Sequence, residues 1–296
     1  MEHLKLLTRS AIWAIRPEAV VLAVMQLTGR VQAAEGRWEA ARPSTFGKGT
    51  AKVGVVPIQG VLTKDGPSWY GSSYDGISSA LDQFANDPEV KRIVLQVDSP
   101  GGEVTGLPEA AALIAQIAKV KPVSAIVDGQ SASAAFWLTS QANDVHLTPS
   151  GEVGSVGVRM MHMDVSKMMD EYGIKVTELY SGDFKTEWSP YKPLSDAAKE
   201  DMQPRLDASR EEFIGAVAAG RGTKATQDII DNSFGQGRMF SASTAWNHGL
   251  VDKVQSSRDF FRAILPPVEE TSNPAPSFPI RRTERELQVR RARLGK

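Results

Sequence analysis

Ser133 is the residue of this 296-residue chain that is best placed to act as a nucleophile. It lies among small residues where a predicted strand gives way to an apolar helix, in the run Ser131-Ala132-Ser133-Ala134-Ala135. A serine at the first turn of a helix lies beside backbone N–H groups that can stabilise an oxyanion. Serine and alanine at a helix start are also typical of capping and close packing. Ser133 therefore needs a base before it can be interpreted as catalytic.

Lys185 is the candidate base, at the end of the run Ser181-Gly182-Asp183-Phe184-Lys185. A lysine accepts a proton only in its neutral form, which is scarce near pH 7 unless apolar surroundings disfavour the charge. Phe184, Trp188 and Tyr191 are the side chains nearby in sequence that could provide such surroundings. A lone lysine in a loop is otherwise a solvated surface residue.

Two glycine-bearing segments could complete a hydrolytic site. In Asp98-Ser99-Pro100-Gly101-Gly102, the glycines allow backbone N–H groups to point outward and hold an oxyanion. In Gly154-Ser155-Val156-Gly157, Ser155 is either a turn hydroxyl or a hydrogen-bond partner for a charged group. Each segment alone is typical of a turn. Together with Ser133 and Lys185 they supply what a Ser–Lys hydrolase requires, and none of these segments contains the histidine of a Ser-His-Asp triad.

The elements that would position these residues alternate between strand and helix. Strands are predicted over residues 53–58, 92–97, 123–127, 144–147, 156–161 and 175–180, and helices over 77–85, 107–119, 133–141, 165–172 and 195–219. Strands that alternate with helices of this length favour parallel pairing with helices on the sheet faces. The predicted fold class is therefore α/β with parallel sheets and flanking helices.

Composition excludes several classes of function. The chain is 41% hydrophobic and 23% charged, and its net charge of −1 gives no field that would attract nucleic acid. It has no cysteine and four scattered histidines, so disulfides, thiolate catalysis and a zinc site are not expected. We expect no cofactor and no nucleic-acid partner.

Three regions are predicted along the chain. Residues 1–50 are expected to be a helical appendage, in which the apolar run 19–27 is too short to span a bilayer and lacks the pattern of a signal peptide. Residues 51–265 are expected to form the domain that carries the Ser–Lys site. Residues 266–296 are expected to be a disordered basic tail, because they are rich in Pro, Glu and Ser before a segment with seven basic and two acidic side chains.

Several ordered motifs resemble the signal peptide peptidase A family. They are Val97-Asp98-Ser99-Pro100-Gly101-Gly102, Ser133-Ala134-Ala135-Phe136-Trp137, Gly154-Ser155-Val156-Gly157-Val158, Ser181-Gly182-Asp183-Phe184-Lys185, and the stretch from Gly237-Arg238-Met239-Phe240-Ser241 to Gly249-Leu250-Val251-Asp252. The resemblance covers about residues 52–255. It implies a crotonase/Clp-protease-like superfold and a serine protease that assembles as a ring or dome.

The resemblance also implies roles for individual residues. Ser133 would be the nucleophile and Lys185 the general base, and Ser155 would orient the lysine amine. The N–H groups of Gly101 and Ala134 would form the oxyanion hole. We expect an extended polypeptide to bind beside the glycine loop, against residues Gly102, Val104 and Phe136.

Two departures from the family pattern refine this expectation. The family usually has Ser-Gly-Gly where this chain has Ser133-Ala134-Ala135, and membrane-bound members carry an N-terminal anchor that we do not expect here. The chain is more similar to the tailed-phage head-maturation proteases. Capsid or scaffold proteins would then be its partners, in the cytoplasm of a bacterial host or associated with the procapsid.

Three alternatives remain open. The chain could be a bacterial peptidase that degrades signal peptides. It could be an acyl-CoA hydratase or isomerase of the same superfold, with Glu103 or Glu152 as the base. It could also be a capsid assembly protein that has lost its chemistry.

Overall fold

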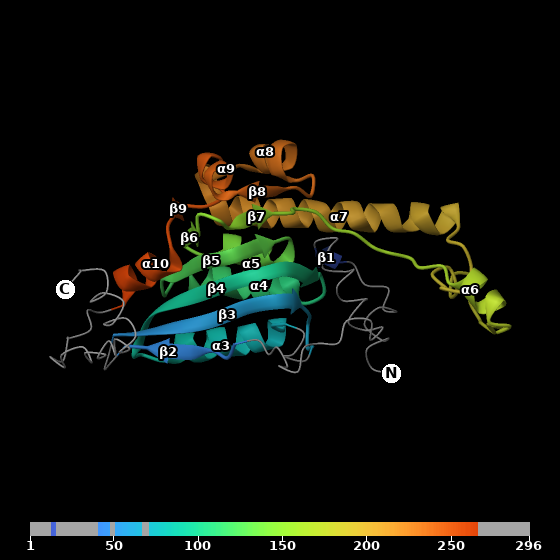
Figure 1. The fold of residues 1–296 in the computed structure, drawn as a ribbon, viewed down its shortest axis with the longest axis horizontal. Coiled ribbons are helices and arrows are strands. Elements are labelled where there is room, and N and C mark those ends of the chain that lie inside the picture. Colours follow the sequence, from blue (N-terminus) through green and yellow to red (C-terminus); the bar gives the residue numbers. More distant parts are fainter. Residues whose placement is uncertain (1–12, 16–40, 48–50, 67–70, 266–296) are drawn as a thin grey trace, which may run out of the picture. The chain divides into compact units, whose positions relative to one another are not determined.

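The computed structural model describes residues 13–15, 41–47, 51–66 and 71–265 (Figure 1). The chain divides after Leu265 into two units, and every described residue belongs to the first. Residues 266–296, which we expected to be a disordered tail, and residues 19–27, which we expected to be helical, lie outside the described residues.

A parallel sheet forms the centre of the first unit. Its main path runs β3-β4-β5-β6-β9, and every neighbouring pair on this path is parallel. The strands are β3 (Lys52–Leu62), β4 (Val90–Glu103), β5 (Val123–Ala132), β6 (Asp144–Leu147) and β9 (Lys253–Val254). Helices α3 (Tyr74–Asn86), α4 (Leu107–Ile117) and α5 (Ala134–Ser140) alternate with the first strands. The predicted α/β class with a parallel sheet is confirmed.

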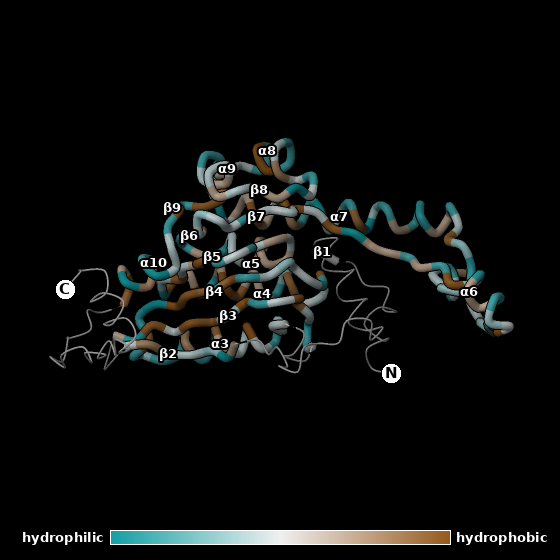
Figure 2. Tube along the Cα trace, viewed as in Figure 1, coloured by the Kyte–Doolittle hydropathy of each residue, from teal (hydrophilic) through white to brown (hydrophobic). Residues whose placement is uncertain are grey.

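The two faces of the sheet are covered unequally. One face packs against α3, α4 and α5 in the main core, which includes Ile58, Leu95 and Trp137. The other face has a smaller apolar cluster, in which Phe260 of α10 (Ser257–Ile264) covers Val94 and Ile126. Figure 2 shows the hydrophobic stretches running along the central strands. Burial on both faces explains why these strands are continuous apolar runs in the sequence.

Antiparallel strands are added around this parallel centre. They are β1 (Trp13–Ile15), which pairs with β4, β2 (Ser44–Phe46), which pairs with β3, and β8 (Met239–Ser241), which pairs with β7 (Glu152–Gly154). β7 itself joins the centre by parallel pairing with β5. The described parts of residues 1–50 thus include two strands that join the sheet, whereas the helix we expected over 19–27 lies outside the described residues. A strand of three residues is too short to leave a periodic signal in the sequence.

The segment after β7 leaves the sheet. Residues 159–195, which we call the arm, contain the short helix α6 (Ser166–Glu171) and lead into α7 (Asp196–Arg221). Figure 1 shows α6 near the end of α7 that is remote from the sheet. The strands expected at 156–161 and 175–180 do not form in the described structure: the first segment contains only a single β-bridge residue, Arg159, and the second contains no β-pairing.

Short elements link α7 back to the sheet. They are η1 (Gly222–Lys224), α8 (Gln227–Ile229), η2 (Ile230–Phe234) and α9 (Ala242–Asn247). The side chain of Arg221 at the end of α7 is almost completely buried and forms a 3.0 Å ion pair with Asp252, which also accepts a hydrogen bond from the backbone N–H of Val145 on β6. Asp252 thereby fixes the end of α7 to the sheet.

Candidate active site

Ser133 lies at the turn between β5 and α5 and has an unusual backbone. Its φ is 54° and its ψ is −120°, a conformation that is costly for a residue with a Cβ. The residue is buried, and its backbone N–H donates a 2.8 Å hydrogen bond to the carbonyl of Gly154. Its hydroxyl makes only a long contact of 3.4 Å, to the carbonyl of Gly157. The turn is held firmly by the backbone, whereas the hydroxyl is held weakly.

Ser155 occupies a matching position on the neighbouring strand. β5 and β7 pair with Ala132 opposite Gly154, so Ser133 and Ser155 each follow one residue of that pair. Ser155 has a φ of 56°, is buried, and donates its backbone N–H to the carbonyl of Arg238. Among the described residues, these two serines are the only non-glycine residues with positive φ. Strained backbone of this kind clusters at functional sites.

The glycine loop lies at the end of β4, beside β3. Gly101 has a φ of 96°, and a Cβ on Gly102 would lie 1.8 Å from the carbonyl oxygen of Leu62. Both positions therefore require glycine. The hydroxyl of Ser99 donates to the carbonyl of Gly60 and accepts the N–H of Gly101 at 3.2 Å, which fixes the loop.

The loop and the nucleophile turn come from neighbouring strands. Ser99 is the last residue of β4 that pairs with β5, opposite Ser131. Two residues later the chain is at Gly101 on one strand and at Ser133 on the other. Ala134 begins α5, and the first N–H groups of a helix have no acceptor within that helix. The structure thus brings together the segments that carry Ser133, Ser155, Gly101 and Ala134.

The three residues expected to bind substrate differ in how far they are buried and in whether they lie in the glycine loop. Gly102 lies in the loop, and Val104 is half-buried against the core. Phe136 is fully buried among core side chains, so its ring forms part of the core and not of an exposed surface. Glu103, one of the alternative bases, is buried, and its carboxylate accepts the backbone N–H of Lys64. The other, Glu152, pairs with Ser241 on β8.

Lys185 lies on the arm and its side chain is exposed. Its neighbours Phe184 and Trp188 line a groove of about 430 Å³ together with Asp201, Met202 and Arg205 from the first half of α7. Phe184 is itself 76% exposed, and Trp188 packs edge-on against His162. In this chain the aromatic side chains do not enclose the lysine.

α7 separates the lysine segment from the nucleophile. Its second half packs on α5, where Trp137 stacks on Phe213 with ring centroids 4.8 Å apart. Met202, beside the lysine segment, precedes Phe213 by eleven residues, which is about 16 Å along a helix. The lysine segment thus lies against the first half of α7, whereas α5, which begins directly after Ser133, packs against the second half.

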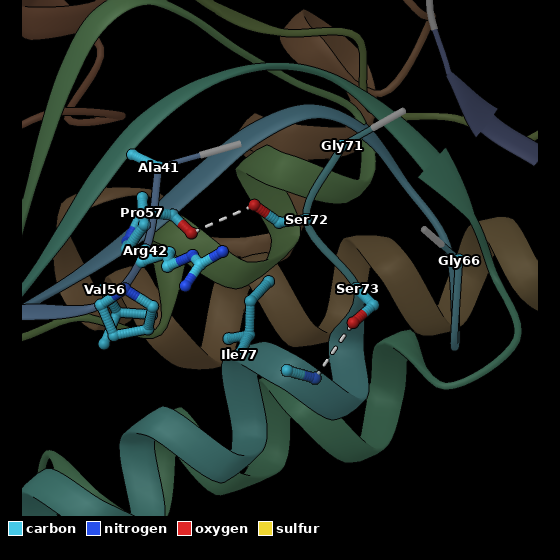
Figure 3. A pocket seen from close by; sticks show the side chains of 11 residues that line it. Ala41, Arg42, Val56, Pro57, Gly66, Gly71, Ser72, Ser73 and Ile77 are labelled. Atoms are coloured by element: carbon cyan, nitrogen blue, oxygen red, sulfur yellow. Dashed lines mark hydrogen bonds between the residues drawn. The ribbon is translucent and has the colours of Figure 1, made fainter. Parts of the chain in front are cut away.

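A second hollow, at the start of α3, contains none of the predicted site residues. It has a volume of about 180 Å³, and its lining includes Arg42, Pro57, Ser72 and Ile77 (Figure 3). Ser72 donates its hydroxyl to the carbonyl of Pro57, and Ser73 caps α3 by accepting the N–H of Gly76. These hydroxyl groups are engaged in holding the turn.

The supporting roles of two residues were not identified from the sequence. The hydroxyl of Tyr74 donates a 2.6 Å hydrogen bond to the carbonyl of Glu103, and burial raises the pKa of Tyr74 well above its usual value. This bond anchors the end of the glycine loop to α3. Burial also raises the pKa of Asp98, although its carboxylate accepts the N–H of Gln130. Both side chains act on segments distant in sequence, so the motif that contains Asp98 does not reveal its partner, and no motif contains Tyr74.

The described residues contain no cluster of three metal-ligating side chains. No helix in the described part of the chain is both long and apolar enough to cross a membrane.

Comparison with known proteins gives the family. The model of "Peptidase family S49" matches residues 115–264. The chain is 34% identical to "Capsid assembly protease C" of Escherichia phage lambda over 70% of its own length and 47% of that protein's. It is 26% identical to "Putative signal peptide peptidase SppA" of Enterococcus faecium, over 72% of its length and 62% of the relative's.

The chain thus spans about half the length of the phage relative. Among solved structures, ClpP1 of Listeria monocytogenes is similar with a TM-score of 0.43 and 17% identity, over 71% of this chain and 94% of the other. The family match covers half of the sequence and includes Ser133, Ser155 and Lys185. The chain belongs to peptidase family S49.

Proposed function

We propose that this chain is a serine endopeptidase that uses Ser133 as nucleophile and Lys185 as general base. The observation that carries this proposal is the pair of adjacent serines with positive φ, Ser133 and Ser155. Each of the two strained turns costs about 1–3 kcal/mol. A serine with only a structural role would give no reason to keep such strain. Membership of a peptidase family agrees with it.

The proposed reaction begins when the neutral amine of Lys185 takes the proton of the Ser133 hydroxyl. Ser133 attacks a peptide carbonyl, and the N–H groups of Gly101 and Ala134 stabilise the tetrahedral oxyanion. Lys185 then donates the proton to the leaving amine, and water hydrolyses the acyl-enzyme. The hydroxyl of Ser155 orients the lysine amine. The weak contact of the Ser133 hydroxyl leaves it available to the base.

Lys185 would reach Ser133 of a second subunit. Ten of the fourteen large apolar side chains that are exposed among the described residues lie on the arm, including Tyr172, Leu179 and Phe184. An apolar surface of this kind marks a protein interface. We therefore propose a homo-oligomer in which the arm packs on a neighbouring copy, which buries Lys185 and completes that neighbour's site.

The proposed substrate is a polypeptide, and the proposed setting is the maturation of a phage head. The similarity to the lambda protein named as a capsid assembly protease favours this setting. Capsid or scaffold proteins would then be cut inside the procapsid or in the bacterial cytoplasm. A peptidase that degrades signal peptides is the competing role.

Labelling with a fluorophosphonate, read by mass spectrometry, tests the dyad. We expect one adduct, at Ser133, that is lost in Ser133→Ala and strongly reduced in Lys185→Ala. Lys175→Ala is the matched control, because Lys175 is another exposed lysine of the arm, and its labelling should equal that of the wild type. An unlabelled but correctly folded wild-type protein would rule out the proposal.

A further inference from the structure

The strand β1 occupies an edge of the candidate active site. It pairs antiparallel with the end of β4, with Trp13 opposite Glu103, Ala14 opposite Gly102 and Ile15 opposite Gly101. These partners are the glycine loop and the residue that follows it. A segment from the far N-terminal part of the sequence is thus hydrogen-bonded to the loop proposed to hold the oxyanion.

The edge that β1 uses is the one nearest the nucleophile. A strand has two edges, and β3 takes the first by pairing Val61 with Gly101 and Leu62 with Gly102. The second edge of β4 belongs to β5 up to Ser99 and is released where β5 turns toward Ser133. Since β3 already holds one edge of the loop, β1 must lie on the edge that β5 has left.

An extended polypeptide substrate would need this same edge. Backbone pairing with a free strand edge is the common way to bind a peptide in extended form. β1 already makes that pairing, and it runs so that Ile15 is opposite Gly101 while Trp13 is farther from the loop. We propose that residues 13–15 are an intramolecular competitor that must leave the edge before a substrate can bind. This inference rests on the proposed peptidase function.

Competition by a tethered segment has a defined kinetic signature. A substrate binds only the fraction of molecules whose edge is free, so the apparent KM rises by the inverse of that fraction. Once the substrate is bound, the segment is displaced and kcat is unchanged. If β1 occupies the edge in about nine molecules of ten, its removal lowers the KM about 10-fold.

Proline substitutions in the full chain remove the pairing. Successive residues of an antiparallel strand point their N–H groups alternately toward and away from the partner, so Ala14→Pro or Ile15→Pro removes a hydrogen bond to β4. Ala14→Val and Ile15→Val are matched controls that retain the N–H and favour a strand. Only one of residues 14 and 15 has its N–H directed at β4, so only the proline at that position weakens the pairing. We expect this variant to lower the KM for a peptide substrate several-fold at constant kcat, while both valine variants match the wild type.

A binding experiment checks the inference without turnover. A labelled peptide with the sequence of residues 10–18 is added to the Ser133→Ala protein, and its binding is measured by fluorescence anisotropy. It should bind more tightly to the double variant that also carries the proline substitution that weakens the pairing of β1. Equal KM values and equal peptide affinities in all variants would overturn the proposal that residues 13–15 compete with the substrate. Fluorophosphonate labelling of Ser133 distinguishes this failure from failure of the peptidase itself, because the small probe does not need the strand edge.

Discussion

The backbone N–H of Ser133 donates to the carbonyl oxygen of Gly154, 2.8 Å away, and this bond couples the two strained turns of the site. Gly154 directly precedes Ser155, so the position of the proposed nucleophile depends on the strand that carries the proposed lysine-orienting hydroxyl. A change in either turn is expected to affect the other.

Replacement of Ser133 should separate activity from stability. Ser133→Ala and Ser133→Gly are both expected to lose about 10⁴–10⁶-fold in kcat, because each lacks the nucleophile. Ser133→Gly should nevertheless be more stable than Ser133→Ala by about 1 kcal/mol, since only glycine adopts a φ of 54° without strain. Urea unfolding of the two variants measures the difference, and a less stable glycine variant would contradict the account of strain.

Ser155→Ala should reduce kcat by about 10–100-fold without abolishing it, because the base is then present but poorly oriented. Its effect should depend on pH, since orientation of the amine also influences the fraction that is neutral. If the pH–rate profile of Ser155→Ala has the same shape as that of the wild type, whatever its absolute kcat, Ser155 has a structural role only.

Mixing two inactive variants tests the origin of the base. Ser133→Ala supplies intact arms and Lys185→Ala supplies intact nucleophiles, so co-assembly rebuilds about a quarter of the sites in a randomly mixed oligomer. We expect peptide hydrolysis to return to roughly that fraction after the variants are mixed under conditions that allow subunit exchange. Hydrolysis that never returns, despite demonstrated exchange, would place both residues in one subunit.

Gly102→Ala should destabilise the fold and inactivate the enzyme. The added Cβ would overlap the carbonyl oxygen of Leu62, which belongs to the adjoining strand and cannot move alone. The expected cost is more than about 3 kcal/mol in the free energy of unfolding. Gly215→Ala is the control, because it has open space around it within α7 and should gain about 0.5–1 kcal/mol. Thermal unfolding distinguishes the two.

Asp144 should make the protein sensitive to acid. Burial disfavours its charge, but hydrogen bonds from His146 and Ser124 and the positive charge of Arg92 outweigh burial and lower the pKa of the carboxyl. A lowered pKa gives stability that is complete above the unfolded value of about 3.9 and is lost as the pH falls through the folded value. Asp144→Asn is expected to flatten the fall in unfolding free energy below about pH 5. An unchanged pH dependence would contradict this role.

The central α/β layers could be predicted from the sequence because each strand and helix there is locally consistent. The runs around Val94 and Ile126 are apolar on both faces, and helices such as α3 and α4 lie between the strands and have a clear helical period. Ser133 could also be named as a candidate nucleophile from its residue type and its small neighbours. Its strained φ was not, since that depends on pairing with a strand more than twenty residues later.

The arm and β1 could not be predicted for opposite reasons. Residues 175–180 have the composition of a strand but have no partner in the described structure, so propensity alone was misleading. Residues 13–15 show no strand pattern, and only long-range pairing with Gly101 and Gly102 makes them a strand. In both cases the outcome is decided by a neighbour that the local sequence does not specify.

The length of α7 between the lysine segment and α5 has a consequence for when the enzyme works. If a solitary subunit carries its nucleophile and its base too far apart to meet, then a newly made copy is inert without any inhibitor. The onset of proteolysis would then follow subunit concentration steeply, as in a reaction of higher order. Polypeptides met by dilute subunits would be spared, and cutting would begin only where copies are crowded together.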